Sequence, residues 1–159
     1  MASGSKSNET ASSQLTLEQE QTFIQSSTNE EDLEKYYYEN VLPESSPIPI
    51  PPHAEIKSQQ KKDYIQVRYK WRENDYVYIC RWHTRTPNSP SEQGNSWVIM
   101  RHYLGIAAGS NARHSYYEVL IAKNKWILKE TWDKAIRAKN KGNATKEQKE
   151  ILKNGHWDV

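Results

Sequence analysis

The sequence predicts an α+β fold: a small antiparallel sheet of four to five strands, followed by two short C-terminal helices and preceded by a disordered acidic N-terminal tail. Three observations predict it. Apolar and polar residues alternate strictly along residues 65–71, the helix-capping signals of residues 54–159 are confined to the last thirty residues, and both charge and apolar content change near His53. Residues 54–159 are therefore expected to fold as one domain.

The first 53 residues have the composition of a disordered tail. They carry nine acidic and two basic residues, a net charge of −7, and their few apolar residues are diluted by Ser, Thr, Gln and Glu. Thr28 or Asn29 could cap a short helix that carries Glu30, Glu31 and Asp32 in its first turn. Residues 43–52 are rich in proline, which is typical of an extended linker.

The alternating segment is typical of a half-buried strand. Ile65, Val67, Tyr69 and Trp71 fall on one face, with polar residues between them. Residues 72–75 supply a turn, and residues 76–82 supply a second strand that is apolar on both faces, so the pair is expected to form a hairpin with the second strand in a central position.

Further strands are expected at residues 96–104, 116–122 and 126–128, with Asn124 at the last turn. Thr131 is expected to cap a helix that ends near Gly142. The run Thr145-Lys-Glu-Gln148 predicts a capping box at the start of a second helix, which Gly155 would end.

The charge and cysteine content restrict the classes of function. Residues 54–159 carry 20 basic and 11 acidic residues, a net charge of +9, which favours a polyanionic partner, RNA above all, or an acidic protein. Cys80 is the only cysteine, so neither an internal disulfide nor a thiolate metal site can form. We expect a cytoplasmic protein that has no cofactor and no membrane contact, and that would need a non-classical route to leave its cell.

The densest group of polar residues is Arg81-Trp-His-Thr-Arg-Thr-Pro87, where a strand runs into a long loop. A histidine there could transfer protons near neutral pH, and arginines could bind a phosphate. These are the groups that cleave RNA without a metal. The predicted catalytic residues are His83, Arg85 and Arg101, and the predicted nucleic-acid contacts are Arg81, Thr84, Thr86, Asn95, His114 and His156.

Four of these residues also have a purely structural interpretation. His83 could be a solvated loop histidine, Arg81 and Arg101 could form ordinary salt bridges, and His156 could favour the C-terminal end of a helix. His102 lies on an aliphatic face and is expected to be a core residue. The order His83, Asn95, His102 also suggests a metal-dependent His-Asn-His nuclease, but no carboxylate lies close to share the metal.

Four runs of residues resemble the C-terminal toxin-type domains of Gram-positive polymorphic toxins and phage-associated proteins. They are Ile65-Gln-Val-Arg-Tyr-Lys-Trp71, Arg81-Trp-His-Thr-Arg-Thr-Pro87, Gln93-Gly-Asn-Ser-Trp-Val98, and the run from Ala144 to Trp157. The resemblance covers about residues 55–157. It implies a small nuclease, often a metal-independent ribonuclease of α+β type, that an immunity protein holds inactive, with His83 and Arg85 in the motif that carries the site.

Three classes of function therefore remain open. The first is a toxin-like ribonuclease, the second is a nucleic-acid-binding module without catalysis, and the third is a phage or immunity-type protein that neutralises or recruits another protein. Cleavage of RNA in the presence of a chelator separates the first class from the second.

Overall fold

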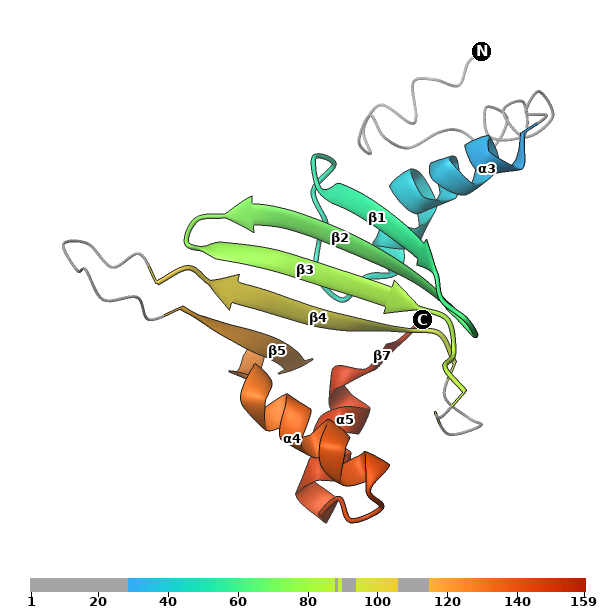
Figure 1. Ribbon diagram of the computed structural model, residues 1–159. Coiled ribbons are helices and arrows are strands. Elements are labelled where there is room, and N and C mark those ends of the chain that lie inside the picture. Colours follow the sequence, from blue (N-terminus) through green and yellow to red (C-terminus); the bar gives the residue numbers. More distant parts are fainter. Residues whose placement is uncertain (1–28, 88, 90–93, 106–114) are drawn as a thin grey trace. The chain divides into compact units, whose positions relative to one another are not determined.

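The computed structural model describes residues 29–87, 89, 94–105 and 115–159 (Figure 1). The chain divides into two compact units, Met1–Ser45 and Ser46–Val159. Each unit is described by itself.

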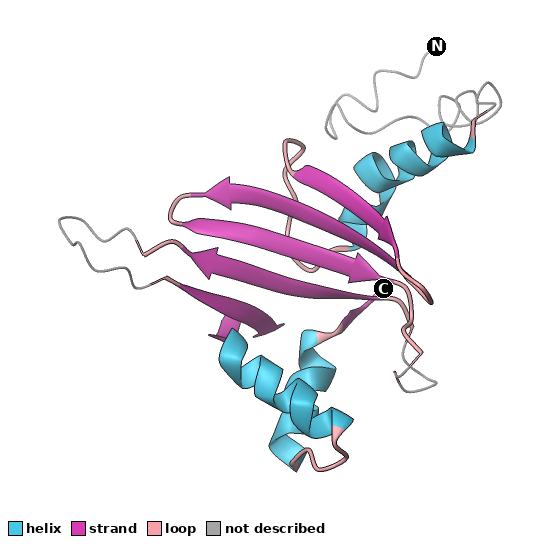
Figure 2. Cartoon of the chain, viewed as in Figure 1, coloured by secondary structure: helices cyan, strands magenta, loops and turns pink. Residues whose placement is uncertain are grey.

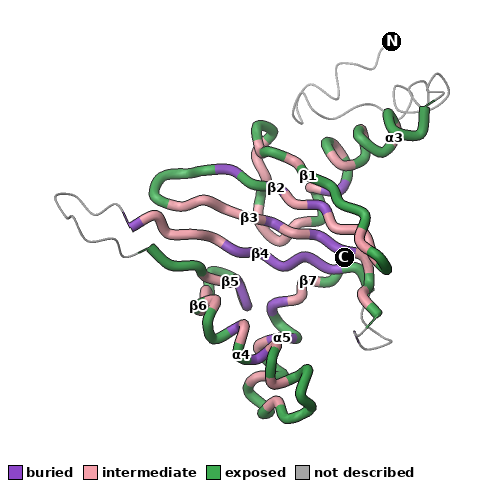
Figure 3. The backbone as a smooth tube through the Cα atoms, in the orientation of Figure 1, coloured by how far each residue is buried: buried purple, intermediate pink, exposed green. Residues whose placement is uncertain are grey.

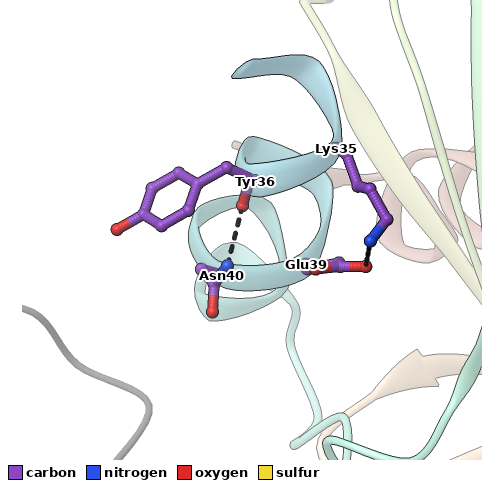
Figure 4. A network of polar contacts seen from close by, with 4 residues as sticks. All are labelled: Lys35, Tyr36, Glu39 and Asn40. Carbon is purple, nitrogen blue, oxygen red and sulfur yellow. Dashed lines mark hydrogen bonds and ion pairs between the residues drawn. The ribbon is translucent and has the colours of Figure 1, made fainter. Parts of the chain in front are cut away.

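The described part of the first unit is helical. Helix α3 spans Glu30–Tyr36, followed by the π-helical turn η1 (Tyr37–Val41) and the 3-10 turn η2 (Leu42–Ser45). The Asn29 side chain accepts a hydrogen bond from the backbone N–H of Glu31, so the predicted N-cap is confirmed. In the next turn Lys35 pairs with Glu39 at 3.3 Å, and the Asn40 amide donates to the Tyr36 carbonyl (Figure 4).

These helices correct the expectation of disorder up to residue 53. The three acids of the first turn of α3 lie at the positive end of the helix dipole, where they favour helix formation. The unit boundary also falls earlier than expected, between Ser45 and Ser46 rather than near His53. Beyond it, the Ser46 hydroxyl contacts the thiol of buried Cys80, so this part of the proline-rich segment belongs to the second unit.

The second unit is built on one antiparallel sheet with the strand order β1-β2-β3-β4-β5-β6 (Figure 2). The strands are β1 (Glu55–Gln60), β2 (Ile65–Glu73), β3 (Tyr76–His83), β4 (Ser96–Tyr103), β5 (Tyr116–Ala122), β6 (Lys125–Leu128) and β7 (Trp157–Asp158). Strand β7 pairs with the first residues of β4, and β5 pairs with the last residues of the same strand. The antiparallel α+β fold is confirmed.

The predicted hairpin of β2 and β3 is confirmed, and β3 is central as expected. Its turn places Asn74 at φ 58°, and Asn124 has the same φ in the turn between β5 and β6. Asparagine is the residue that tolerates this left-handed conformation best after glycine, which explains both turns.

The predicted number of strands was too low, because the sheet has seven. Strand β1 has a single apolar residue, Ile56, so it gives no alternating pattern in the sequence. Strand β7 has only two residues, too few for any periodicity to appear.

Two C-terminal helices follow the sheet, as predicted. Helix α4 spans Lys129–Asn140 and α5 spans Lys146–Gly155. The capping box of Thr145 and Gln148 is present, with both reciprocal hydrogen bonds. Gly142 follows α4 at φ 78°. Thr131 was wrong as a cap, since α4 begins at Lys129 and its N-cap is Leu128.

The two helices pack on β4, β5 and β6, on one face of the sheet (Figure 1). Their shared core contains the buried residues Val98, Met100, Val119, Ile121, Trp132, Ala135 and Leu152. We call this side of the sheet the helix face. Because side chains alternate along a strand, the opposite face buries a second set, which includes Val67, Tyr69, Cys80, Trp97 and Ile99. The buried stretches of β3 and β4 are purple in Figure 3.

Candidate functional site

His83 is the last residue of β3 and lies on the helix face. It pairs across the ladder with Ser96, and only 8% of its surface is exposed. Its Nδ1 lies 3.0 Å from the carbonyl oxygen of Thr84. A carbonyl can only accept, so Nδ1 carries the proton and Nε2 keeps the lone pair that can accept a substrate proton.

Burial lowers the pKa of His83 below its usual value, and the positive charge of Arg81 lowers it further, while the hydrogen bond to Thr84 opposes both. At neutral pH the imidazole is therefore uncharged. It is a base that is ready to accept a proton, rather than a permanent cation.

His156 lies next to His83 in space, although it is near the C-terminal end of the second unit. It follows the last residue of α5, and the two ring centroids lie 6.2 Å apart at an interplanar angle of 80°. Its Nδ1 lies 2.6 Å from the carbonyl oxygen of Leu152, so this ring also has its lone pair on Nε2. Burial lowers the pKa of His156. The charges of Lys139 and Arg81, and that of His83 when His83 is protonated, lower this pKa further, while the hydrogen bond to Leu152 opposes them.

The position of His156 is fixed by a close contact one residue earlier. A Cβ added to Gly155 would lie 2.3 Å from Cζ3 of Trp132, so the Gly155 backbone packs directly against that indole. The indole also lies beside the imidazole of His156, with 5.2 Å between ring centroids. Trp132 is 4% exposed. A buried ring therefore holds the end of α5 and the histidine after it.

Arg81 completes this group. It precedes His83 by two residues on β3, so its side chain leaves the same face of the sheet. Burial and the charge of Arg68 lower its pKa, while Tyr64 and Asp133 raise it. The guanidinium stays charged at neutral pH because an arginine side chain is far too strongly basic to lose its proton there. Arg81 takes part in no salt bridge within the described residues.

We name Arg81, His83 and His156 the histidine site. It contains two imidazoles of fixed tautomer, both uncharged at neutral pH, and one cation. Such a pair can take a proton and, once it holds one proton, give it, while the cation can stabilise negative charge. The sequence predicted all three residues, but could not show that they meet. It missed Trp132 and Gly155, whose contact leaves no mark in a single sequence.

The predicted loop residues hold their own loop together. The Arg85 guanidinium donates to the Ser89 carbonyl at 3.0 Å, and the Arg85 N–H donates to Oδ1 of Asn95 at 3.2 Å. The Thr84 hydroxyl accepts from the N–H of Ile65 at 2.9 Å. The Thr86 carbonyl accepts from both the N–H and the hydroxyl of Ser89. Substrate contact by Arg85, Thr84, Thr86 or Asn95 stays a prediction.

The structure does not bring Arg101 to His83. Arg101 lies on the face of β4 opposite the helix face, opposite Tyr78 and Glu118 on the flanking strands. Its guanidinium lies 4.2 Å from the ring of Tyr76 and 4.1 Å from the ring of Trp126, and its Nε donates to Glu118 at 2.7 Å. This is a packed and charge-neutralised arginine, so we do not include it in the site.

A further histidine, His102, also lies outside the site. His102 is partly buried on the helix face and stacks on Tyr117, with ring centroids 4.1 Å apart. His114 falls outside the described residues. Among the residues that the structure does describe, no three His, Cys, Asp or Glu side chains are placed to hold a metal ion, and no helix is long and apolar enough to span a membrane.

Comparison of the chain with family models, with curated proteins and with solved structures found no match. The resemblance to toxin-type domains therefore stays a prediction, and the functional assignment depends on the geometry of the histidine site.

Proposed function

We propose that residues 46–159 form a toxin-like ribonuclease domain that cleaves RNA without a metal ion, with His83 and His156 as its acid and base. One observation carries the proposal: two neutral imidazoles, each with Nδ1 tied to a backbone carbonyl, lie 6.2 Å apart between ring centroids. The charge of Arg81 acts on both of them.

The proposed reaction uses the pair when it holds one proton. The unprotonated imidazole accepts the proton of a 2′-hydroxyl, whose oxygen attacks the adjacent phosphorus. The bond from phosphorus to the 5′-oxygen breaks, and the protonated imidazole gives its proton to that leaving oxygen. The products are a 2′,3′-cyclic phosphate and a free 5′-hydroxyl, and Arg81 stabilises the charge that builds on the phosphate.

The spacing of the rings fits this reaction. Each imidazole makes a hydrogen bond of about 2.9 Å to a different oxygen of the same phosphodiester. The rings must therefore lie within several ångströms of one another, as His83 and His156 do.

The test is cleavage of a short fluorescent RNA by the full chain in the presence of a chelator. We expect His83→Ala and His156→Ala each to lower the rate about a hundredfold or more, since each removes one partner of a proton transfer. His102→Ala is the matched control, because His102 stacks on Tyr117 away from the pair, and it should cut at the wild-type rate.

Thermal unfolding would establish that each variant is folded. A DNA strand of the same sequence should stay intact, since it has no 2′-hydroxyl. Wild-type cutting by either His83→Ala or His156→Ala, or cutting only after a metal is added, would refute the proposal.

A non-catalytic nucleic-acid-binding module is the second candidate. It is favoured by the basic half of the helix face, where Lys57, Arg68, Lys70 and Arg72 lie on β1 and β2 and take part in no salt bridge among the described residues. The same assay separates the two candidates, because binding alone gives a mobility shift without fragments.

A further inference from the structure

The ladder register of β1, β2 and β3 aligns three cations across the sheet. Lys57 lies opposite Arg68, and Arg68 lies opposite Arg81. Residues paired in this way share a face, and neighbouring strands are about 4.8 Å apart. The three side chains therefore form one row across about 10 Å of the helix face. We call Lys57, Arg68 and Arg81 the cationic row.

A second row runs beside it. Gln59 lies opposite Gln66, Gln66 opposite His83, and His83 opposite Ser96. The cationic row and this polar row are two residues apart on every strand, so they are adjacent on the same face. The polar row reaches the histidine site at His83, and the cationic row reaches it at Arg81. Both rows end at the proposed reaction centre.

The cationic row is open to solvent at its outer end. Lys57 is exposed and Arg68 is partly exposed. Within the described part of the second unit, helices α4 and α5 pack over β4, β5 and β6 rather than over β1 and β2 (Figure 1). No described residue pairs with the row through a salt bridge.

Repulsion between the three like charges of the cationic row lowers the stability of the folded sheet. Like charges directly opposite one another destabilise a sheet, and here the charge of Arg68 disfavours the charged form of Arg81. Nothing in the packing of β1 or β2 requires cations at these positions, because two glutamines, exposed Gln59 and partly buried Gln66, fill the same positions in the next row. A row of unpaired cations on a sheet is stabilised when it binds an anion.

We propose that the cationic row binds successive phosphates of a single-stranded nucleic acid and leads the strand across β1 and β2 to the histidine site. This rests on the proposed function for the position of the reaction. The proposal adds two statements to the proposed function: the substrate is bound as a single strand, and the strand crosses β1 and β2 along the cationic row. The glutamines of the polar row lie where they can contact the sugars or bases of the same strand.

The test measures the affinity of the full chain for a fluorescent twelve-nucleotide oligodeoxyuridine, which cannot be cleaved because it has no 2′-hydroxyl. We expect Lys57→Gln and Arg68→Gln each to weaken binding about tenfold in 50 mM salt. Each should also reduce the slope of log affinity against log salt by about 0.7, the value for one phosphate contact on a single strand.

Lys123→Gln is the control for net charge. Lys123 is exposed in the turn between β5 and β6, far from β1 in the strand order, and its loss should change affinity less than twofold. An equal loss from Lys123→Gln and Arg68→Gln would overturn the row, because it would mean that only total charge matters. Tighter binding of a duplex than of the single strand would overturn the choice of substrate.

The failure of this proposal can be told apart from the failure of the proposed function. If the Lys57→Gln and Arg68→Gln variants bind the oligodeoxyuridine weakly but no RNA is cut in chelator, the cationic row does bind nucleic acid and the proposed ribonuclease activity is wrong. If the wild type and Arg68→Gln cut RNA with the same kcat/KM, the ribonuclease activity is supported and the proposed role of the cationic row is wrong.

Discussion

Replacing Gly155 by alanine tests the packing that positions His156. The new Cβ would lie 2.3 Å from Cζ3 and 2.7 Å from Cη2 of Trp132, more than 0.5 Å inside ordinary contact, and that indole is 4% exposed. Extra volume in a packed core costs about 1–3 kcal/mol, and the better helix propensity of alanine returns at most about 1 kcal/mol. The expected net loss is about 1–2 kcal/mol.

For a domain of this size that loss lowers the Tm by about 4–10 °C, which thermal unfolding followed by circular dichroism can measure. The control is Gly94→Ala, since an added Cβ at Gly94 meets nothing within 4 Å and its φ is not positive. It should leave the Tm within about 1 °C. If Gly155→Ala unfolds at the wild-type temperature, the end of α5 is not held by Trp132, and the fixed position of His156 loses its explanation.

Three further predictions follow from the same contacts. Arg101→Ala should lower the Tm, because it removes the guanidinium between Tyr76 and Trp126 and leaves Glu118 unpaired. It should leave the rate of RNA cleavage in chelator unchanged. A reduced cleavage rate with a normal Tm would show that Arg101 belongs to the site. The lowered pKa values of His83 and His156 stabilise the folded state fully above the unfolded pKa of about 6.5, and this stability is lost as the pH falls through the folded values. The Tm should therefore fall less between pH 7 and pH 5 in a His83→Gln, His156→Gln double variant than in the wild type, and identical pH profiles would rule this out. Deleting residues 1–45, which carry the whole of the −7 charge, should leave the second unit folded and tighten its binding to RNA at low salt, with the difference shrinking as salt rises. Equal affinities at low salt would show that the acidic segment does not compete.

The protonation of the pair also sets the expected pH dependence of cleavage. The reaction needs one neutral and one charged imidazole, and both pKa values lie below the ordinary value for histidine. The charged groups that face the pair are Arg81 from β3 and Lys139 from α4, and both disfavour protonation. We expect a bell-shaped profile of kcat/KM with its maximum below pH 6.5. A maximum at alkaline pH would be incompatible with this acid and base.

The sequence predicted those elements whose local signals agree with their packing. Alternating residues gave β2, the Thr145 capping box gave α5, and Asn124 gave the last hairpin, because each is decided by neighbours within a few positions. Strand β1 could not be predicted in this way. Its pairing partner lies across a turn, and five of its six side chains are exposed, so it has no apolar pattern.

The histidine site shows the same limit. The cluster around His83 was visible because its residues are adjacent in the chain, whereas its contact with His156 depends on how α5 packs on the sheet. The structure does not bring Arg101 to the same site, for a simpler reason. Ser96 lies beside His83, and Arg101 lies five residues further along β4, an odd number that turns its side chain to the other face.

The pairing register of β1 depends on very few buried side chains. Ile56, opposite Tyr69, is the one apolar side chain that distinguishes the two faces of this edge strand. A slip of one residue would therefore cost little burial, yet it would turn Lys57 to the opposite face. The amide protons of β1 should exchange with solvent well before those of β3, and replacing Ile56 by serine would populate alternative pairings. Ile56 alone therefore favours the observed register of this charged edge strand.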